Sequence, residues 1–331
     1  MSTKARKWIP WIITALLVQA QPIVPQVERY GGITAGKEDI LAVVSTANYT
    51  KVPFELVDGL IFVKAELEGR QGNFILDTGA PSLIINDNNQ QGKTEDWQCV
   101  TSDIQPRAIT VNQFQWAGIE KRELEAITLD ISHLEKTYKR KVLGVIGYQV
   151  FSDREILVNA RTMQIVILDG QKNYLRRFAE PITTTGFDRQ GHLPVIEARA
   201  GDKTYFFGFD SGCTANLLDE KLLDQLPEGA YRMLDQKQLL GFSGEPQDVM
   251  VISTSAFQLE YLPAKDTEYL VTSLAHLEAS DIHVSGLLGY SFFKNLTFSI
   301  NYATNQLNIW EIHDMDTGLT SVERGAKYLE D

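Results

Sequence analysis

The chain has 331 residues, 44% of them hydrophobic, and its 43 acidic and 31 basic residues give a formal net charge of −12 at pH 7. A chain of this length can bury a substantial core and favours about two domains. The excess of acidic residues argues against binding nucleic acid or anionic lipid headgroups through a basic patch, so no nucleic-acid partner is expected.

Residues 1–20 have the pattern of a secretory signal peptide. Three basic residues precede an apolar stretch over residues 8–18, and Val18-Gln19-Ala20 resembles a small-residue cleavage site. The apolar stretch is short for a membrane span, so no stable membrane anchor is expected, and an uncleaved N-terminal anchor is the alternative. A cleaved signal peptide predicts a secreted or periplasmic protein, and with either interpretation the rest of the chain would lie outside the cytoplasm.

Residues 21–51 are interpreted as an N-terminal extension or a propeptide. Several Pro and Gly residues surround a short apolar run at residues 40–44, which could add one strand. The sequence leaves both interpretations open.

Residues 52–169, called the first half below, contain many short runs that are typical of strands. A polar, loop-like segment interrupts them at residues 91–107, and residues 133–141 read as a charged surface segment. Few helical periods are present, so an all-β fold is predicted. The expected strands are residues 54–57, 60–67, 74–76, 108–116, 124–131, 156–159 and 163–168.

The first half contains an apolar run that ends in an acid, Phe74-Ile75-Leu76-Asp77-Thr78-Gly79-Ala80. A carboxylate placed where a strand leaves a core needs compensation for its lost hydration. Thr78 offers a hydroxyl that can bond across a tight loop, and Gly79 offers an open backbone N–H and a flexible φ. A second apolar run follows at residues 83–85.

The same pattern returns in residues 181–312, called the second half below, after a linker at residues 170–180. There Phe206-Phe207-Gly208-Phe209 leads to Asp210-Ser211-Gly212-Cys213. An offset of 133 residues places Asp77 on Asp210 without a gap, and an offset of 142 places Gly144-Val145-Ile146-Gly147-Tyr148 on Gly286-Leu287-Leu288-Gly289-Tyr290. The two halves therefore form an internal repeat.

The rest of the second half has three further features. Residues 217–226 have the apolar spacing of a short helix that stops before Pro227, and residues 249–252 alternate like a strand. Between them, Gly241-Phe242-Ser243-Gly244 has the glycine spacing of a hairpin tip. Residues 313–331 form a charged C-terminal tail with little to bury.

The two Asp-Thr/Ser-Gly motifs, each followed by an apolar-apolar-Gly block, resemble those of aspartic proteases, and most closely of retropepsin-like proteases. This resemblance implies two tandem retropepsin-like (acid protease) β lobes with pseudo-twofold symmetry, at residues 52–169 and 181–312. The active site would lie between the lobes. In this family Gly241, Phe242, Ser243 and Gly244 would be the tip of a flap, and a plain hairpin turn is the alternative.

The resemblance also implies a role for each residue of the two loops. Asp77 and Asp210 would share a water, and their proximity would raise the pKa of one carboxyl and lower that of the other. Thr78 and Ser211 would hydrogen-bond across to the opposite loop. Gly79 and Gly212 would keep side chains away from the water.

Ala80 and Cys213 would form the floor of the pocket, where pepsin-like enzymes place a hydroxyl and retroviral-type enzymes an alanine. Cys213 departs from both patterns. A role for Cys213 as a nucleophile is disfavoured, because no His is near it in sequence and the matching Ala80 has no thiol. A Cys99–Cys213 disulfide would obstruct the cleft, so two free thiols are expected.

The predicted function is therefore that of a secreted or periplasmic aspartic endopeptidase acting on a peptide or protein substrate. No cofactor is expected, and the five His residues show no metal-ligand spacing. A monomer is expected because one chain carries both acids. The alternatives are a non-catalytic peptide- or inhibitor-binding module of the same fold, and pairing of lobes between chains, which the difference between Ala80 and Cys213 disfavours.

Overall fold

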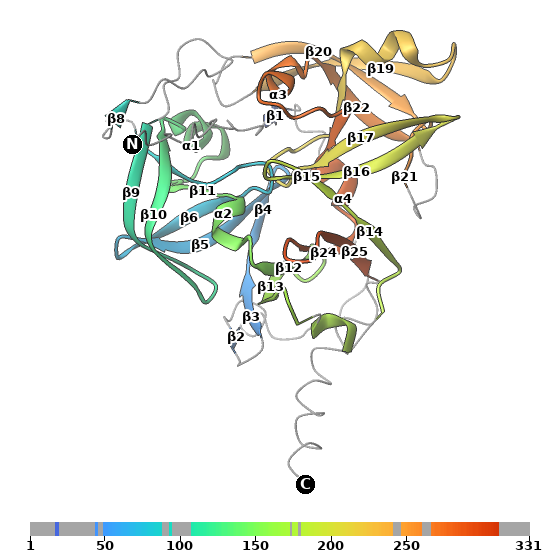
Figure 1. Cartoon of the computed structure of the whole chain (residues 1–331). Coiled ribbons are helices and arrows are strands. Elements are labelled where there is room, and N and C mark those ends of the chain that lie inside the picture. Colours follow the sequence, from blue (N-terminus) through green and yellow to red (C-terminus); the bar gives the residue numbers. More distant parts are fainter. Residues whose placement is uncertain are drawn as a thin grey trace, which may run out of the picture.

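The structure is a computed structural model, and it describes residues 17–19, 44–45, 49–87, 93–94, 107–172, 174–177, 180–240, 246–259 and 266–310. Strands predominate in these residues, as Figure 1 shows, so the prediction of a β-rich fold is confirmed. The strands form three sheets. Most of residues 1–48, residues 241–245, the segment around Cys99 and the tail from residue 311 lie outside this description.

An eight-stranded sheet is drawn entirely from the first half. Its strand order is β4-β5-β6-β11-β7-β10-β9-β8, and an additional pairing of β5 with β9 closes six of the strands into a barrel. The strands are β4 (Glu55–Val57), β5 (Leu60–Leu67), β6 (Arg70–Leu76), β7 (Leu83–Asn86), β8 (Lys93–Thr94), β9 (Arg107–Trp116), β10 (Ile119–Leu129) and β11 (Gly144–Ile146).

A ten-stranded sheet is drawn from the second half, together with β1 (Leu17–Gln19), which pairs with β19. Its other strands are β15 (Asp188–Gln190), β16 (Leu193–Ala200), β17 (Lys203–Phe209), β18 (Leu217–Asp219), β19 (Tyr231–Leu240), β20 (Pro246–Thr254), β21 (Gln258–Leu259), β22 (Thr267–Thr272) and β23 (Gly286–Leu288).

The third sheet has seven strands and joins the two halves. Strand β12 (Arg154–Asn159) pairs antiparallel with β24 (Thr297–Asn301) over five residue pairs. Glu155 is buried at this junction and accepts a hydrogen bond of 2.6 Å from the hydroxyl of Ser299 on β24. The remaining strands are β2 (Val44–Ser45), β3 (Tyr49–Pro53), β13 (Gln164–Asp169), β14 (Thr183–Gly186) and β25 (Gln306–Trp310).

The internal repeat in the sequence corresponds to a repeat in strand pairing. Strand β11 lies between β6 and β7, parallel to the first and antiparallel to the second. Strand β23 lies in the same way between β17 and β18. Each acidic loop therefore connects two strands that are separated by a third, which comes from the apolar-apolar-Gly block.

A glycine follows each of these inserted strands and lies against the acidic loop. A Cβ at Gly147 would lie 2.6 Å from the carbonyl oxygen of Ala80 and still closer to that of Ser82. A Cβ at Gly289 would collide with the carbonyl oxygens of Cys213 and Ala215. Both glycines are needed because a side chain would push the acidic loops away.

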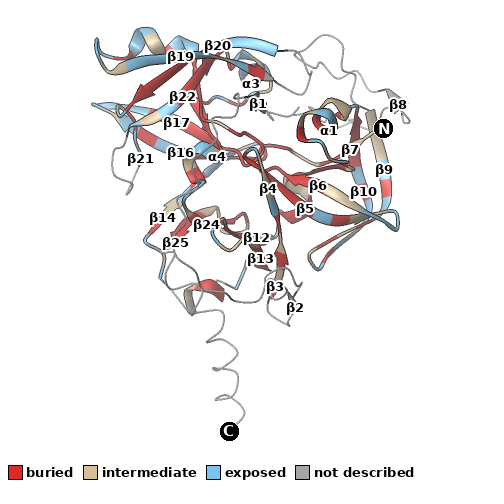
Figure 2. Ribbon diagram, turned by 180° about the vertical axis from the view of Figure 1, so that it is seen from behind, coloured by how far each residue is buried: buried red, intermediate tan, exposed pale blue. Residues whose placement is uncertain are grey.

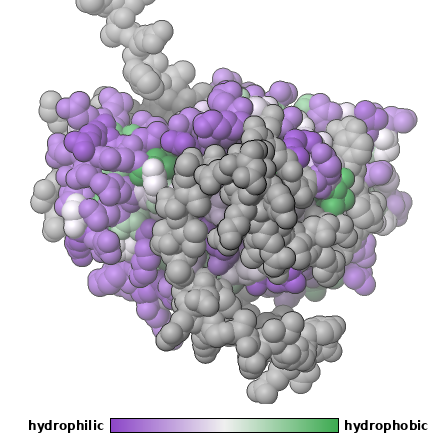
Figure 3. Space-filling model, turned by 90° about the horizontal axis from the view of Figure 1, so that it is seen from below, coloured by the Kyte–Doolittle hydropathy of each residue, from purple (hydrophilic) through white to green (hydrophobic). Residues whose placement is uncertain are grey.

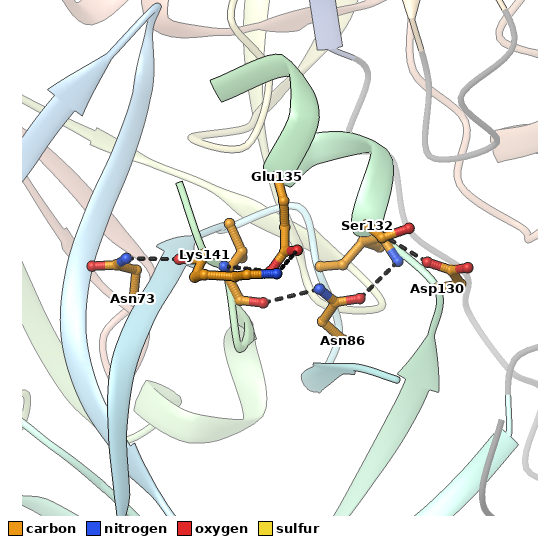
Figure 4. A network of polar contacts seen from close by, with 8 residues as sticks. Asn73, Asn86, Asp130, Ser132, Glu135 and Lys141 are labelled. Carbon is orange, nitrogen blue, oxygen red and sulfur yellow. Dashed lines mark hydrogen bonds and ion pairs between the residues drawn. The ribbon is translucent and has the colours of Figure 1, made fainter. Parts of the chain in front are cut away.

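Polar side chains fix the segment that leads into β11. Glu135, on α1 (Ser132–Tyr138), accepts hydrogen bonds from the ammonium group of Lys141 at 2.9 Å and the backbone N–H of Val142 at 3.0 Å. Asn86, on β7, donates to the carbonyl oxygen of Val142 at 3.0 Å. Figure 4 shows this network between α1 and the neighbouring strands. This network fixes the chain directly before β11 and so keeps β11 in the position from which it supports the Asp77 loop.

Two sequence expectations need correction. Residues 217–226 are not one helix, because β18 takes residues 217–219 into the sheet and only η3 (Glu220–Gln225), a 3₁₀ helix, follows. Residues 133–141 contain α1, which buries Leu134 and Tyr138. The other helices are α2 (Tyr148–Phe151), η2 (Tyr174–Arg177), α3 (Ala275–Ala279) and α4 (Tyr290–Phe293). None of the helices in the described part is long and apolar enough to cross a membrane.

Buried residues concentrate on the inner strands of all three sheets. Figure 2 shows them running from the barrel through the centre of the molecule into the ten-stranded sheet. One cluster of buried side chains spans both halves and includes Phe74, Phe209 and Phe298 from the three sheets. Described side chains on the face in Figure 3 are mostly hydrophilic, with isolated hydrophobic ones, which agrees with the acidic composition.

We predict that Gly147→Ala lowers the free energy of unfolding by about 1–3 kcal/mol, because the new methyl group would meet two carbonyl oxygens of the Asp77 loop. Chemical denaturation measures the change. Gly186→Ala is the matched control, since nothing lies within 4 Å of a Cβ at Gly186. Equal stabilities of the two variants would contradict the close packing.

Candidate functional site

The two acidic loops are anchored in equivalent ways. The backbone N–H of Asp77 donates to the carbonyl oxygen of Ile146 on β11 at 3.0 Å. The backbone N–H of Asp210 donates to that of Leu288 on β23, also at 3.0 Å. The inserted strands thus set where each aspartate leaves its own strand.

The two carboxyl groups lie at the point where the loops meet. The N–H of Gly79 donates to Oδ1 of Asp77 at 2.7 Å, and that of Gly212 donates to Oδ1 of Asp210 at 2.8 Å. A Cβ at Gly79 would lie 2.6 Å from the carboxyl atoms of Asp210, and one at Gly212 would collide with the carboxyl of Asp77. Each glycine therefore packs against the acid of the opposite loop, which brings Asp77 and Asp210 together as predicted.

Thr78 and Ser211 cross-link the two loops. The hydroxyl of Thr78 donates to the carbonyl oxygen of Phe209 at 3.0 Å and accepts from the N–H of Ser211 at 2.9 Å. The hydroxyl of Ser211 donates to the carbonyl oxygen of Leu76 at 3.0 Å and accepts from the N–H of Thr78 at 3.0 Å. Four reciprocal hydrogen bonds thus fix one loop against the other.

Burial dominates the electrostatics of the pair, because both carboxyl groups are 0% exposed. Burial raises the pKa of Asp77, and the hydrogen bond with Asp210 and backbone N–H groups oppose the rise. The pKa of Asp210 is raised well above its usual value by burial and by the charge of Asp77. Two adjacent carboxylates in a dry site cannot both ionise easily, so the pair retains a proton to higher pH than an isolated aspartate.

The second oxygens of the two carboxyls have no partner elsewhere in the described chain. Oδ2 of Asp77 and Oδ2 of Asp210 are buried, and no other group of the described chain hydrogen-bonds to them. A single proton held between the carboxyls would give each of these oxygens a partner. A pair that shares one proton can offer one acid and one base side by side.

The floor of the site differs between the halves. Ala80 and Cys213 are both fully buried, in equivalent hydrophobic clusters of the two halves. Cys213 is a free thiol, and its Sγ donates to the carbonyl oxygen of Ala215 at 2.9 Å. The thiol hydrogen is therefore directed away from Asp210, and burial raises the pKa of the thiol well above its usual value.

Two residues near the pair were not identified from the sequence. His192, between β15 and β16, is 4% exposed, and its Nε2 lies 2.6 Å from the carbonyl oxygen of Gly79. Tyr302, after β24, is buried, and its hydroxyl has no partner in the described chain. Burial, and then the charges of Asp77 and Asp210, raise the pKa of Tyr302. Only the repeat, which aligns His192 with Gly59, could have drawn attention to His192.

Gly241, Phe242, Ser243 and Gly244 lie outside the described residues. The strands on either side of them, β19 and β20, pair antiparallel up to Leu240 opposite Pro246. Cys99 also lies outside the description. Among the described side chains, no group of three His, Cys, Asp or Glu residues could hold a metal ion.

We predict that Thr78→Val lowers the free energy of unfolding by about 1–3 kcal/mol, because it leaves the carbonyl of Phe209 and the N–H of Ser211 unpaired in a buried site. Denaturant titration measures the loss. Thr78→Ser keeps the hydroxyl and should retain most of the stability. If Val and Ser were tolerated equally, the cross-links would not stabilise the site.

Comparisons with known proteins identify no family for the chain. No family model matches it. No curated protein matches it either. Among solved structures, the chain is similar to basic 7S globulin from soybean, with 10% sequence identity and a TM-score of 0.45, over 81% of this chain and 96% of that one.

Proposed function

We propose that this protein is an aspartic endopeptidase built from two retropepsin-like lobes, which hydrolyses peptide bonds with a water activated between Asp77 and Asp210. One observation carries the proposal. Two loops with the same sequence pattern, one from each half, place two fully buried carboxyls against each other. A buried turn acid in each half would not need this mutual contact.

The geometry supports hydrolysis by general acid and base catalysis. The ionised carboxyl takes a proton from water as the water oxygen attacks the carbonyl carbon of the peptide, and the protonated carboxyl gives its proton to the carbonyl oxygen. The resulting tetrahedral diol then collapses. The carboxyl that took the proton from water gives it to the leaving nitrogen, the other carboxyl takes a proton from one diol hydroxyl as the C=O bond re-forms and the C–N bond breaks, and the pair again holds one proton. This sequence needs no covalent intermediate.

Rigidity of the pair is the main contribution of the surrounding chain to this reaction. The backbone N–H groups of Gly79 and Gly212 hold one oxygen of each carboxyl, and the cross-links of Thr78 and Ser211 prevent the loops from separating. Catalysis that depends on two groups in a fixed relation loses rate when either moves. Because both carboxyls are fully buried in this conformation, the proposal also requires that the site opens to admit a peptide.

The proposed setting is a secreted or periplasmic monomer that acts on peptide or protein substrates. One chain supplies both acids, so no second copy is needed to complete the site. The acidic composition favours neutral or basic partners and does not favour nucleic acid.

We predict that Asp77→Asn and Asp210→Asn each lower kcat for peptide cleavage by at least about 100-fold, because each removes one partner of the proton exchange. Cleavage of a mixed peptide library, followed by mass spectrometry, measures the loss. Asp224→Asn, at an exposed position in η3, is the matched control and should cleave like the wild type. Mixing the two inactive variants should not restore cleavage, and restoration would mean that the acids come from different chains.

The stability of these variants shows whether inactivity reflects chemistry or unfolding. Burial raises the pKa of Asp210 in the folded protein above the value of about 4 that an ordinary Asp has in the unfolded chain. Folding therefore favours the protonated carboxyl, and the stability that this provides is complete below about pH 4 and is lost as the pH rises. Asp210→Asn cannot ionise, and it should therefore gain stability relative to the wild type as the pH rises above about 4. An inactive variant that unfolds readily at neutral pH would not test the mechanism.

We predict that the wild type works best at mildly acidic pH and that Ala80→Ser moves the acid limb of its kcat/KM profile downward by about half to one pH unit. The methyl side chain of Ala80 cannot donate a hydrogen bond to the pair, and the thiol of Cys213 donates to the carbonyl oxygen of Ala215 instead. A hydroxyl at position 80 would stabilise the ionised form and lower the pKa of the pair. Rates measured across the acid range test this. An unmoved limb in an active, folded variant would contradict it.

A further inference from the structure

A third buried carboxyl, which the proposed reaction does not use, lies where the two halves meet. Glu155 is 3% exposed, and its strand β12, from the first half, pairs with β24 of the second half. Neighbouring residues of a strand point to opposite faces of the sheet. Ile156 and its partner Ile300 belong to the apolar core cluster, so Glu155 lies on the other face of the junction.

The second half presents hydrogen-bond donors to this carboxyl. The hydroxyl of Ser299 accepts from the indole N–H of Trp310 at 3.1 Å and from the amide group of Asn308 at 3.2 Å. These two bonds use both lone pairs of the hydroxyl, so its own hydrogen goes to Oε1 of Glu155, 2.6 Å away. The amide group of Asn308 also donates to Oε1, at 3.4 Å.

The orientation of a further amide is fixed in the same way. The amide oxygen of Asn301 accepts from the backbone N–H groups of Ala303 and Thr304, each at 3.1 Å. Its NH2 group must therefore point to the other side, where it donates to Oε2 of Glu155 at 3.4 Å.

The linker between the halves joins this arrangement through Arg176 on η2. The guanidinium group can only donate, and it lies 3.3 Å from the amide oxygen of Asn308 and 2.5 Å from the hydroxyl of Thr184 on β14. The NH2 group of Asn308 is thereby turned toward Glu155. The residues that connect the first half, the linker and the second half in this way are called the junction cluster below: Glu155, Arg176, Thr184, Ser299, Asn301, Asn308 and Trp310.

The junction cluster fits an ionised carboxyl. Among the described residues, the carboxyl of Glu155 meets the three donors of Ser299, Asn301 and Asn308 and no acceptor. A proton on Glu155 would therefore have no acceptor in the cluster. Its arrival would break at least one of the three contacts that cross from the first half to the second.

The protonation of Glu155 does not by itself weaken the fold. Burial raises its pKa, and the hydrogen bonds from Ser299 and Asn301 and the charge of Arg176 oppose the rise. Glu155 therefore takes up a proton in weaker acid than an ordinary Glu, whose pKa is about 4. Because the pKa is raised in the folded protein, the stability that protonation provides is complete below about pH 4 and is lost as the pH rises.

Other charged groups on the elements around the junction cluster form pairs of their own. Arg154, the neighbour of the carboxyl on β12, lies 3.5 Å from Asp153. Asp153 and Asp169 lie 3.9 and 3.1 Å from a lysine ammonium group. On η2, Arg176 also lies 3.5 Å from Glu180, which is exposed. The cluster residues on β14, β24 and β25 are uncharged.

We propose that ionised Glu155 is a clamp that fixes the angle between the two halves, and that its protonation releases the clamp while the chain stays folded. Backbone pairing alone leaves this angle open, because adjacent strands of a sheet twist by about 10–35°. The apolar contacts on the other face have no preferred direction. The inference holds whether or not the protein cleaves peptides. In an enzyme, the release would supply the opening that the buried acidic pair requires.

Pulsed EPR between two spin labels, one on each half, measures this angle as a distance. The labels are attached through Glu125→Cys and Lys203→Cys, at exposed positions of β10 and β17, in a Cys99→Ser background, since Cys213 is buried. The distance distribution should be narrow at about pH 8 and about twofold broader at about pH 4, with an unchanged far-UV circular dichroism spectrum. An unchanged distribution would overturn the proposal, and this comparison needs no variant of Glu155.

A variant of Glu155 tests the cause. Glu155→Gln cannot ionise, and its NH2 group would meet donors, so its distribution should be broad at both pH values. Glu197→Gln, at an exposed position of β16, is the matched control and should behave like the wild type. A narrow distribution in folded Glu155→Gln at about pH 8 would refute the clamp.

The acidic pair also titrates, and the double variant Asp77→Asn/Asp210→Asn removes that titration. Its distribution should still broaden in acid with the wild-type midpoint. Loss of the broadening would assign the change to the acidic pair and overturn the proposal. Protein that shows the broadening in both forms and cleaves no peptide would keep the clamp and end the proposed function.

Arg176 provides a further test, because its charge favours ionised Glu155. Arg176→Leu should raise the midpoint of the broadening by about half a pH unit or more. Arg199→Leu, at an exposed position of β16, is the matched control and should leave the midpoint in place. A distribution in folded Arg176→Leu that equals the wild type at every pH would contradict the role of the junction cluster.

Discussion

The reciprocal hydrogen bonds between the loops of Asp77 and Asp210 are the interaction on which the centre of this molecule depends. Two carboxyl groups have no exposed surface, and burying them without partners would cost several kcal/mol. The backbone N–H groups of the loops reduce that cost. They can do so only while Thr78 and Ser211 hold the loops together, and the packing of Gly147 and Gly289 behind them keeps the loops in place.

Local patterns in the sequence predicted those elements whose own residues form a recognisable pattern. The Asp77 and Asp210 loops are recognisable because an apolar strand, an acid and a glycine follow one another twice, and the inserted strands β11 and β23 are found from the same repeat. The closure of the barrel by β5 and β9 and the pairing of β12 with β24 could not be predicted in this way, because they join distant segments. Residues 217–219 show the same limit. Their spacing suits a helix, but partners on β22 and β23 take them into the sheet.

The arrangement of the site was predictable where two copies of a motif could be compared. His192 has no motif of its own, and its contact partner, the carbonyl oxygen of Gly79, lies 113 residues earlier in the chain. Cys213 was recognised as a departure from both kinds of aspartic protease, but only the structure shows its thiol directed to Ala215. Which donor reaches which acceptor depends on tertiary contacts, which short sequence patterns do not record.

The pairing of β12 with β24 also bears on the order in which the chain can fold. It connects Glu155 to Asn301, so almost the whole length between them must be synthesised before the seven-stranded sheet can join the halves. Closing so long a loop is entropically slow, and segments near the N-terminus emerge from the ribosome first. In a nascent chain that has not yet reached residue 297, Asp77 would therefore lack the sheet that joins its half to that of Asp210. The buried pair of carboxyls would form only after the strands on both sides of this junction have been synthesised.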